Sequence, residues 1–490
     1  MTSNRKTYDT DDVDFDDFDV VIIGGGLTGL TAAYKIMKKN ANLSLAIIET
    51  QDKFGGKLIS LSKGFYFHDF QLYLMQLLQE LHLDTEYIDK NNNKKRIYWR
   101  TKSFNNKFTN FVTAEIFNFV KLVNTMSINY VFNSKIIDEE RRHLGETSVD
   151  DFLNSNLTTS RAKSFCKNLI FLTCGSTKTK NISLLWWLEI LNNAGGFFKR
   201  LKFTLTSDTK ITIKTGLSEM INCLEKKIIS DNEALKIPES VELIKFNDYH
   251  VWVTTNKKIY KCSNVIVAVP PSEIKKIKIM GPINPSHLEY FNQYMSQSVG
   301  YFETTFKSSL SLFEYSGTIV ASYENKLGPR LIYKIKNNIF AGYFSSACLY
   351  NSRQSIIQMI RKFLHQNCQV IEHREKIYEQ GLMNIFRPCS IDKYIDPMND
   401  KCHRIIFAAS EYAKNWPGTA DGAVEAGEHA ACLTLYYLRP QSLTLTEVFK
   451  FMPLKLIKKK INYELWLVNK IFFIVNSLIF WNYLRKAYNF

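Results

Sequence analysis

The sequence contains no Cys-x-x-Cys pair, and its nine cysteines are widely scattered along 490 residues. An odd number of unclustered cysteines argues against a disulfide framework and gives no spacing that suits a zinc ion. We therefore predict reduced thiols, as in an intracellular protein, and no metal site.

A hydrophobic run is also missing from the first nineteen residues, MTSNRKTYDTDDVDFDDFD, which are acidic and polar. A secretory signal needs an apolar core segment, and a matrix-targeting peptide is poor in acidic residues, so neither is predicted. We expect residues 1–17 to form a disordered acidic leader. The rest of the chain shows no internal repeat and no other low-complexity segment.

The formal net charge of +16 raises the question of a nucleic-acid partner. The basic residues, however, are scattered singly, lean toward the C-terminus and lie in no recognisable nucleic-acid-binding module. We therefore predict no nucleic-acid partner. Because the chain is long for one compact core, we expect two domains.

A glycine-rich motif follows a short apolar run in the stretch DVVIIGGGLTGLTAAYKI, residues 19–36. The pattern predicts a buried strand, a tight turn and a helix. In a dinucleotide-binding loop, Gly24 permits the turn, Gly26 lets a pyrophosphate approach the backbone, and Gly29 lets the helix pack closely on the strand. The pyrophosphate is expected at the positive end of the helix dipole. The alternative is a glycine-rich turn of any α/β domain.

The next predicted strand, LSLAIIET, ends on Glu49, twenty residues after Gly29. A carboxylate at this place accepts hydrogen bonds from the ribose diol of a bound dinucleotide. Two further glycines, Gly55 and Gly56, and then Lys57 follow at once. Nicotinamide enzymes have no particular need of a diglycine here, whereas many FAD proteins of the glutathione-reductase type carry one. We therefore predict FAD as the cofactor.

An apolar segment near the C-terminus, residues 465–484, is about long enough to cross a bilayer. Lysines precede it, basic residues close it, and tryptophans lie near both of its ends. Three polar residues interrupt it, so a helix packed on the protein or lying flat on a membrane is the alternative. We expect a membrane anchor that leaves the bulk of the protein facing the cytosol.

The hydrophobic patterns predict a mixed α/β fold: a discontinuous, Rossmann-like FAD-binding domain of the glutathione-reductase type and a second domain of sheet and helix. Helix patterns cover 75–88, most of 92–201, 355–365 and 422–438, and strand patterns cover 210–269, 298–347 and 403–410. We place the boundaries as follows: leader 1–17; FAD-binding domain 18–90, 208–280 and 381–440; substrate domain 91–207 and 281–380; basic linker and C-terminal membrane-associated helix 441–490.

The segment RIIFAASEYAKNWPGTADGAVEAGEHAA, residues 404–431, resembles the C-terminal FAD segment of the flavin-containing monoamine oxidases. It has a strand, a glutamate and a helix entered through W-x-G-x-x-x-G-A-V-E-A-G. With the first glycine motif and Glu49, the chain resembles this family at both ends of its nucleotide domain. The resemblance implies hydride transfer from an amine to FAD, with O2 as the acceptor and an imine or aldehyde and H2O2 as products. We also expect an anchor in the mitochondrial outer membrane and a homodimer.

The same resemblance implies which residues contact FAD. The N-terminus of the closing helix is expected to point its free amides at the pyrimidine edge of the flavin, which becomes anionic on reduction. The residues expected to bind the cofactor are Gly24, Gly26, Gly29, Glu49, Gly56, Lys57, Val241, Ser410, Glu411, Gly418 and Ala420.

Three departures from the family pattern concern the chemistry. By an ungapped count, Gly381 stands where monoamine oxidases carry the cysteine that bonds the flavin, so we predict noncovalent FAD. The two tyrosines that face the substrate fall on Leu382 and Thr419, and the lysine that assists the oxygen reaction falls on Thr304. These last three are the predicted pocket positions, and no catalytic residue is assigned.

Three functions stay open on these grounds. The first is an FAD-dependent oxidase of a small amine. The second is a catalytically degenerate flavoprotein that acts by binding a ligand or a membrane partner, and the third is a flavin dehydrogenase or oxidase of a large apolar molecule. The intact glycines and Glu49 favour the first function, whereas the missing tyrosines and lysine favour the second.

Overall fold

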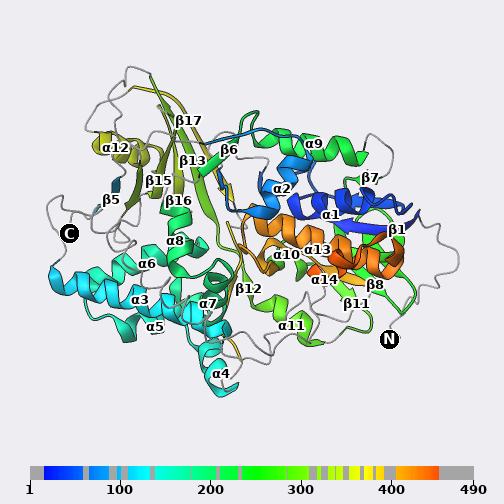
Figure 1. Ribbon diagram of the computed structural model, residues 1–490, viewed down its shortest axis with the longest axis horizontal. Helices are drawn as coiled ribbons and strands as arrows, with labels where there is room; N and C mark the ends of the chain where they lie inside the picture. The colour runs from blue at the N-terminus through cyan, green and yellow to red at the C-terminus, as the bar shows by residue number, and fades with distance from the viewer. Residues whose placement is uncertain are drawn as a thin grey trace, which may run out of the picture.

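Two large sheets and a group of helices make up the molecule (Figure 1). One sheet carries the first glycine motif, and the other sheet and the helical group lie beside it. The computed structural model describes residues 16–58, 66–87, 96–100, 109–132, 138–176, 178–205, 210–229, 234–283, 285–307, 317–321, 329–336, 338–345, 352–364, 369–378, 382–390 and 404–451.

The first sheet has eight strands and is built around β1 (Asp16–Ile23). This strand pairs in parallel with β2 (Leu45–Ile48) on one side and with β10 (Ile259–Val267) on the other. Its last four residues are apolar and at most 4% exposed, as expected for a parallel strand covered on both faces. The other strands are β7 (Ala234–Ile237), β8 (Val241–Phe246), β9 (Val251–Thr255), β11 (Lys278–Met280) and β19 (Ile405–Phe407), in the sheet order β11-β8-β9-β10-β1-β2-β7 with β19 also paired to β10.

Helices from the two ends of the chain pack together on this sheet. In Figure 1, α1 (Leu27–Met37), in blue, lies beside α13 (Ala420–Leu438), in orange. A Cβ added at Gly427 would lie 2.5 Å from the carbonyl oxygen of Thr28, so glycine permits this close approach. Helices that contact this pair are α2 (Leu72–Glu80), α9 (Leu217–Ile229) and α14 (Leu445–Phe451).

The second large sheet has six strands, in the order β17-β13-β16-β15-β14-β5, with α12 (Ser352–Leu364) against β15. Its strands are β5 (Arg96–Arg100), β13 (Val299–Phe306), β14 (Gly317–Ala321), β15 (Pro329–Lys336), β16 (Ile339–Ser345) and β17 (Val370–Tyr378). Two smaller sheets contain β3 (Phe67–His68), β4 (Thr85–Tyr87) and β6 (Lys210–Ile213), and β12 (Tyr294–Met295) with β18 (Ile385–Phe386).

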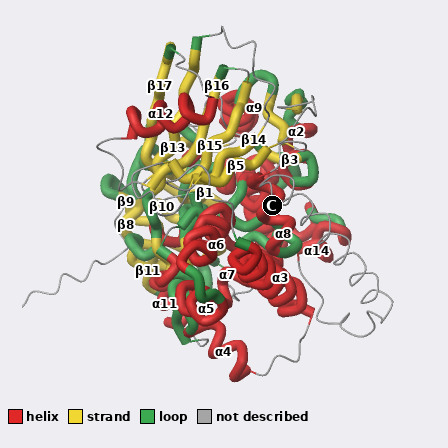
Figure 2. Tube along the Cα trace, turned by 90° about the vertical axis from the view of Figure 1, so that its left-hand side faces the viewer, coloured by secondary structure: helices red, strands yellow, loops and turns green. Residues whose placement is uncertain are grey.

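The helical group gathers at one end of the molecule, away from the tips of the second sheet (Figure 2). Polar residues begin three of its helices: the side chains of Ser148, Thr159 and Ser183 each accept a hydrogen bond from an amide of the first turn. Its helices are α3 (Asn110–Phe132), α4 (Asp138–Glu146), α5 (Val149–Asn156), α6 (Ser160–Cys174), α7 (Leu184–Asn193) and α8 (Phe197–Leu205), and two short helices, α10 (Pro271–Ile274) and α11 (Pro285–Gln293), lie elsewhere.

Two predicted helices differ from the structure. The helix predicted over 75–88 is wrong in its second half, because α2 ends at Glu80 and residues 85–87 form β4 instead. His82 adopts a positive φ of 56° between them, a conformation that stops a helix. A strand, β5, also lies within the region that was predicted to be mostly helical, where it pairs with β14.

The predicted anchor segment, residues 465–484, lies outside the described residues. Among the described helices, none combines the length and the apolar character that crossing a bilayer requires. The last described element is α14, which follows α13 directly and folds back onto it.

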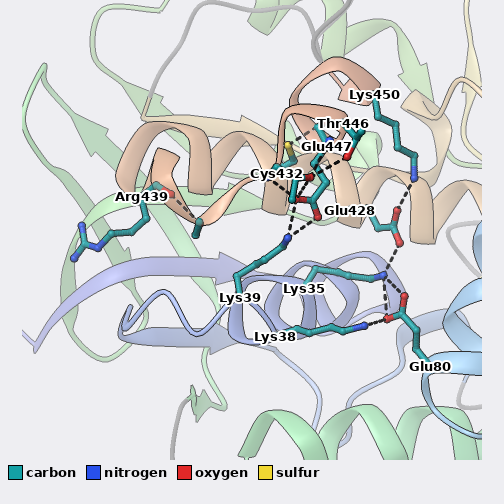
Figure 3. Close-up of polar contacts among 12 residues, drawn as sticks. Lys35, Lys38, Lys39, Glu80, Glu428, Cys432, Arg439, Thr446, Glu447 and Lys450 are labelled. Carbon is teal, nitrogen blue, oxygen red and sulfur yellow. Dashed lines mark hydrogen bonds and ion pairs between the residues drawn. The ribbon is translucent and has the colours of Figure 1, made fainter.

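An ion-pair cluster holds α14 to α13 and to the region of α1 (Figure 3). On α14, Glu447 pairs with Lys39 at 2.6 Å, and Lys450 pairs with Glu428 of α13 at 3.2 Å. The carboxylate of Glu428 also lies 2.7 Å from Lys35 of α1. The cluster therefore joins α1, α13 and α14, and the folded unit extends at least to residue 451.

Candidate active site

The loop between β1 and α1 contains two glycines that close packing of the fold requires and one glycine, Gly26, that it does not require. A Cβ on Gly24, where φ is +104°, would lie 2.7 Å from the carbonyl oxygen of Ala268, and one on Gly29 would lie 2.0 Å from that of Gly24. Gly26, by contrast, has no heavy atom within 4 Å of the added Cβ. The backbone at Gly26 therefore faces open space, as close approach of a ligand requires.

Glu49 lies at the carboxyl end of β2, beside this loop. One oxygen of its carboxylate accepts a hydrogen bond from the amide of Gly25 at 2.8 Å, and the other accepts one from the amide of Gln51 at 2.9 Å. The second glycine pair packs on the same loop, since the amide of Gly55 donates to the carbonyl of Gly25 at 2.8 Å. Gly56 follows with φ +54°, a conformation that suits glycine.

Lys57 connects the second glycine pair to the last third of the chain. Its Nζ lies 3.4 Å from the carbonyl oxygen of Leu382 and 3.8 Å from the carboxylate of Glu411. Glu411 is buried and accepts hydrogen bonds from the amide of Asn384 at 3.1 Å and from the hydroxyl of Ser410 at 2.8 Å. This polar cluster holds segments from three parts of the chain around one space.

The N-terminus of α13 is fixed by its own side chains. The hydroxyl of Thr419 donates to the carbonyl of Trp416 at 2.7 Å and accepts weakly from the amide of Gly422 at 3.4 Å, which caps the helix. Asp421, in the first turn, is 1% exposed and accepts a hydrogen bond from the amide of Leu74 at 2.8 Å. Burial raises the pKa of Asp421 to about 6, despite that hydrogen bond.

One cavity of about 460 Å³ runs past all of these groups. It begins at the glycine loop and Glu49, passes Val241 at the start of β8, and reaches the N-terminus of α13. Gly29 alone among the predicted cofactor residues does not line it, because it packs under the loop. The predicted cofactor residues that line the cavity are Gly24, Gly26, Glu49, Gly56, Lys57, Val241, Ser410, Glu411, Gly418 and Ala420.

These residues fit a dinucleotide that carries a flavin. Two residues that cap helices, Gly26 for α1 and Thr419 for α13, line the cavity, so the positive ends of both helix dipoles lie at its wall. The positive end of a helix dipole stabilises negative charge, which a pyrophosphate carries permanently and a flavin ring carries once it is reduced. Glu49 supplies carboxylate oxygens where a ribose diol is expected.

The far end of the cavity is aromatic, which the sequence did not predict. We call this end the aromatic chamber. The rings of Tyr66 and Tyr333 meet there edge to face, with centroids 5.1 Å apart. The residues that line the chamber are Tyr66, Phe203, Tyr333, Tyr343 and Tyr378. Burial raises the pKa of Tyr66, Tyr333 and Tyr343, so these phenols are neutral at physiological pH. The alternation in RLIYKIK was the only sequence signal for part of this lining, since Leu331 and Tyr333 share one face of a strand.

Of the three predicted pocket positions, two line the cavity and one does not. Leu382 and Thr419 line the cavity. Thr304 does not: it is fully buried, and its hydroxyl is 2.7 Å from Nδ1 of His373. Tyr301 lies opposite Tyr343 in the register of β13 and β16, so Thr304, three residues later, points to the other face of the sheet. Thr304 therefore does not line the cavity, and Gly381 lies outside the described residues.

Comparisons with known proteins point to a family of flavin enzymes. The sequence profile of the flavin containing amine oxidoreductase family matches residues 27–325. The chain is 24% identical over 466 residues to a flavin-containing amine oxidase of Oncorhynchus mykiss, covering 87% of both chains. It is 22% identical over 450 residues to flavin-containing amine oxidase A of Equus caballus, covering 84% of both.

Solved structures show the same fold. A cyclohexylamine oxidase from Brevibacterium oxydans matches 85% of this chain and 98% of its own, with a TM-score of 0.71 at 15% identity. A putrescine oxidase variant redesigned in its cofactor binding matches 86% of this chain and 99% of its own, with a TM-score of 0.70 at 17% identity.

Proposed function

Since the chain belongs to the flavin containing amine oxidoreductase family, and is thus an FAD-dependent, amine oxidase-like oxidoreductase, we propose that it oxidises a small-molecule amine with O2 as the acceptor. The carbon and nitrogen of the amine together lose two electrons and two protons, which leaves a C=N bond. Both electrons and both protons end on O2 as H2O2. One water then hydrolyses the C=N bond to a carbonyl compound and ammonia.

The single observation that supports this proposal is that the glycine loop and the aromatic chamber belong to one cavity. When bound, FAD supplies the acceptor for a hydride equivalent from the substrate. We assign the ribose contact to Glu49, the close backbone approach to Gly26, and the flavin contact to the N-terminus of α13. The aromatic chamber excludes water and surrounds the apolar body of the substrate. We also infer noncovalent FAD from glycine at position 381.

A flavoprotein that only binds is the second candidate. It is supported by Leu382 and Thr419, which line the cavity and stand where the family resemblance implies the two tyrosines that face the substrate.

The visible spectrum of the purified protein, before and after amine addition without oxygen, tests the proposal. We expect flavin bands that survive gel filtration and leave the protein fraction after acid precipitation. An amine from a panel of monoamines, diamines and amino acids should bleach these bands anaerobically, and O2 should restore them with about one H2O2 for each flavin. If dithionite bleaches the flavin but no amine does, the binding-only function is supported instead.

We further propose that residues 465–484 attach the protein to a membrane. Because the ion-pair cluster extends to Lys450, a chain that ends at residue 451 keeps every element that the structure describes. We expect this shortened chain to retain FAD and its melting temperature but to stay in the supernatant, whereas the full chain sediments with anionic lipid vesicles. Equal sedimentation of the two chains would contradict the anchor. Homodimer formation is likewise our proposal, which light scattering tests.

A further inference from the structure

The wall of the cavity contains one buried cation that the proposed function does not use. Arg200, on α8, lines the cavity and is 6% exposed. Its Nε donates to the carbonyl of Thr173 at 3.1 Å, and its Nη2 donates weakly to the carbonyl of Pro417 at 3.4 Å. Its Nη1 is buried, and within the described ranges no acceptor bonds to it. Among the described residues, Nη1 is thus left without a hydrogen-bond partner in a residue that lines the cavity.

No carboxylate among the residues that the structure describes neutralises this charge. The carboxylates that line the cavity bond elsewhere, and in the described part of the chain none forms an ion pair with Arg200; they are Glu49, Glu239, Glu273 and Glu411. Within the described segments, the titratable group that acts on Arg200 is the thiol of Cys174, and burial raises the pKa of this thiol to about 11, so it is neutral. Burial lowers the pKa of Arg200 to about 10, which leaves the guanidinium charged at pH 7.

A second cation adds to the positive potential at the aromatic end. Lys210 is 3% exposed, and its Nζ lies 4.0 Å from the ring centroid of Tyr66 and 5.2 Å from that of Tyr333. The two rings that line the cavity are therefore already in contact with an ammonium group of the protein. A substrate whose only charge is a protonated amine meets like charge here, whereas an anionic group is attracted.

We propose that the substrate carries a carboxylate and that Arg200 binds it, so that the amine oxidised is that of an amino acid. A guanidinium nitrogen without a partner donates a charge-assisted hydrogen bond to a carboxylate oxygen, and this bond is stronger than one between neutral groups. Such a pair also compensates the burial of the arginine charge. The inference rests on the proposed oxidation for its substrate class, but the binding of a carboxylate is testable without turnover.

The test titrates the FAD-loaded protein with two matched probes that contain no amine and cannot be oxidised by this route: phenylacetate, an anion, and 2-phenylethanol, a neutral analogue. Flavin absorbance reports binding of either. We expect phenylacetate to bind wild type at least tenfold more tightly than 2-phenylethanol. Equal affinities would overturn the proposal, and this comparison does not depend on any variant that folds poorly.

Variants then assign the effect to Arg200. Arg200→Met should lose at least tenfold in phenylacetate affinity with the affinity for 2-phenylethanol unchanged, Arg200→Lys should keep part of the preference, and Lys202→Met, an exposed cation of the same helix, should match wild type. The proposal would be overturned if Arg200→Met loses FAD, Arg200→Lys retains it, and the anion preference does not change. The positive charge of Arg200 would then serve the cofactor.

The same experiments separate this inference from the proposed function. If phenylacetate binds through Arg200 but no amino acid or amine bleaches the flavin, the carboxylate site stands and the oxidase function fails. If simple monoamines bleach the flavin and the anion preference is absent, the oxidase function stands and the carboxylate site fails.

Discussion

Gly26→Val is expected to give a folded protein that has lost FAD. The backbone at Gly26 adopts φ −74° and ψ 178°, an extended conformation that valine accepts readily. No protein atom lies within 4 Å of the added Cβ, so the fold has room for the side chain. The space that the side chain enters is the cavity itself, where we place the pyrophosphate. The dissociation constant for FAD should rise by about tenfold or more, since a 1.4 kcal/mol loss in binding free energy is a factor of ten. Flavin absorbance per protein after gel filtration should fall accordingly.

Thermal unfolding of the apoprotein is the control, and it should differ little between Gly26→Val and wild type stripped of FAD. Gly29→Val is the contrasting variant, because its Cβ would lie 2.0 Å from the carbonyl oxygen of Gly24 and disrupt the packing of α1. That variant is expected to fail to fold. Full flavin occupancy in Gly26→Val would show that this loop is not the cofactor site.

Asp421→Asn should stabilise the protein above pH 6. Burial raises the pKa of Asp421 to about 6 from a usual value of 3.8, opposed by the amide of Leu74 and assisted by the charge of Glu425. The folded state therefore holds the proton more tightly than the unfolded state. The stabilisation from this group is complete below pH 4 and is lost as the pH rises from about 4 to 6. A shift of two pKa units corresponds to at most about 3 kcal/mol, which asparagine recovers because its amide oxygen still accepts from Leu74.

Melting temperatures from pH 4 to 8 measure this effect, as the difference between Asp421→Asn and wild type. Asp150→Asn is the matched control, because the pKa of Asp150 is shifted in the opposite direction. Burial raises the pKa of Asp150, but hydrogen bonds from Lys167 and Thr179 outweigh it and lower the pKa. That variant should be less stable than wild type at pH 7, with the deficit shrinking as the pH falls below 4. A difference for Asp421→Asn that does not vary between pH 4 and 6 would contradict the raised pKa.

The parts of the fold that the sequence predicted are those in which local pattern and tertiary position coincide. The run VVII before Gly24 is a buried parallel strand because both faces of the sheet are covered, and that burial is what makes the run continuous. A Cβ added at Gly24 or Gly29 would lie 2.7 or 2.0 Å from a carbonyl oxygen, so the turn requires glycine at both positions and their spacing predicts it. The domain boundaries that we placed stay a prediction.

The aromatic chamber and Arg200 were not predictable in the same way. Tyr66, Arg200, Tyr333 and Tyr378 come from four distant segments, and each of them has an ordinary appearance in its own segment. The place of Thr304 away from the cavity has a related cause: an ungapped count gives a residue number, whereas the register of β13 against β16 decides which face that residue occupies.

The glycine loop and the N-terminus of α13 both line the cavity but come from an early and a late part of the chain, and this sets an order of events during synthesis. The glycine loop leaves the ribosome early, but its partner helix α13 and the strand β19 are among the last described elements. Until residues 404–438 have emerged, β10 lacks β19 and α1 lacks α13, so the apolar surfaces of both are exposed. FAD capture is thus a late step, and a chain stalled before α13 carries an open nucleotide loop that cannot retain its cofactor.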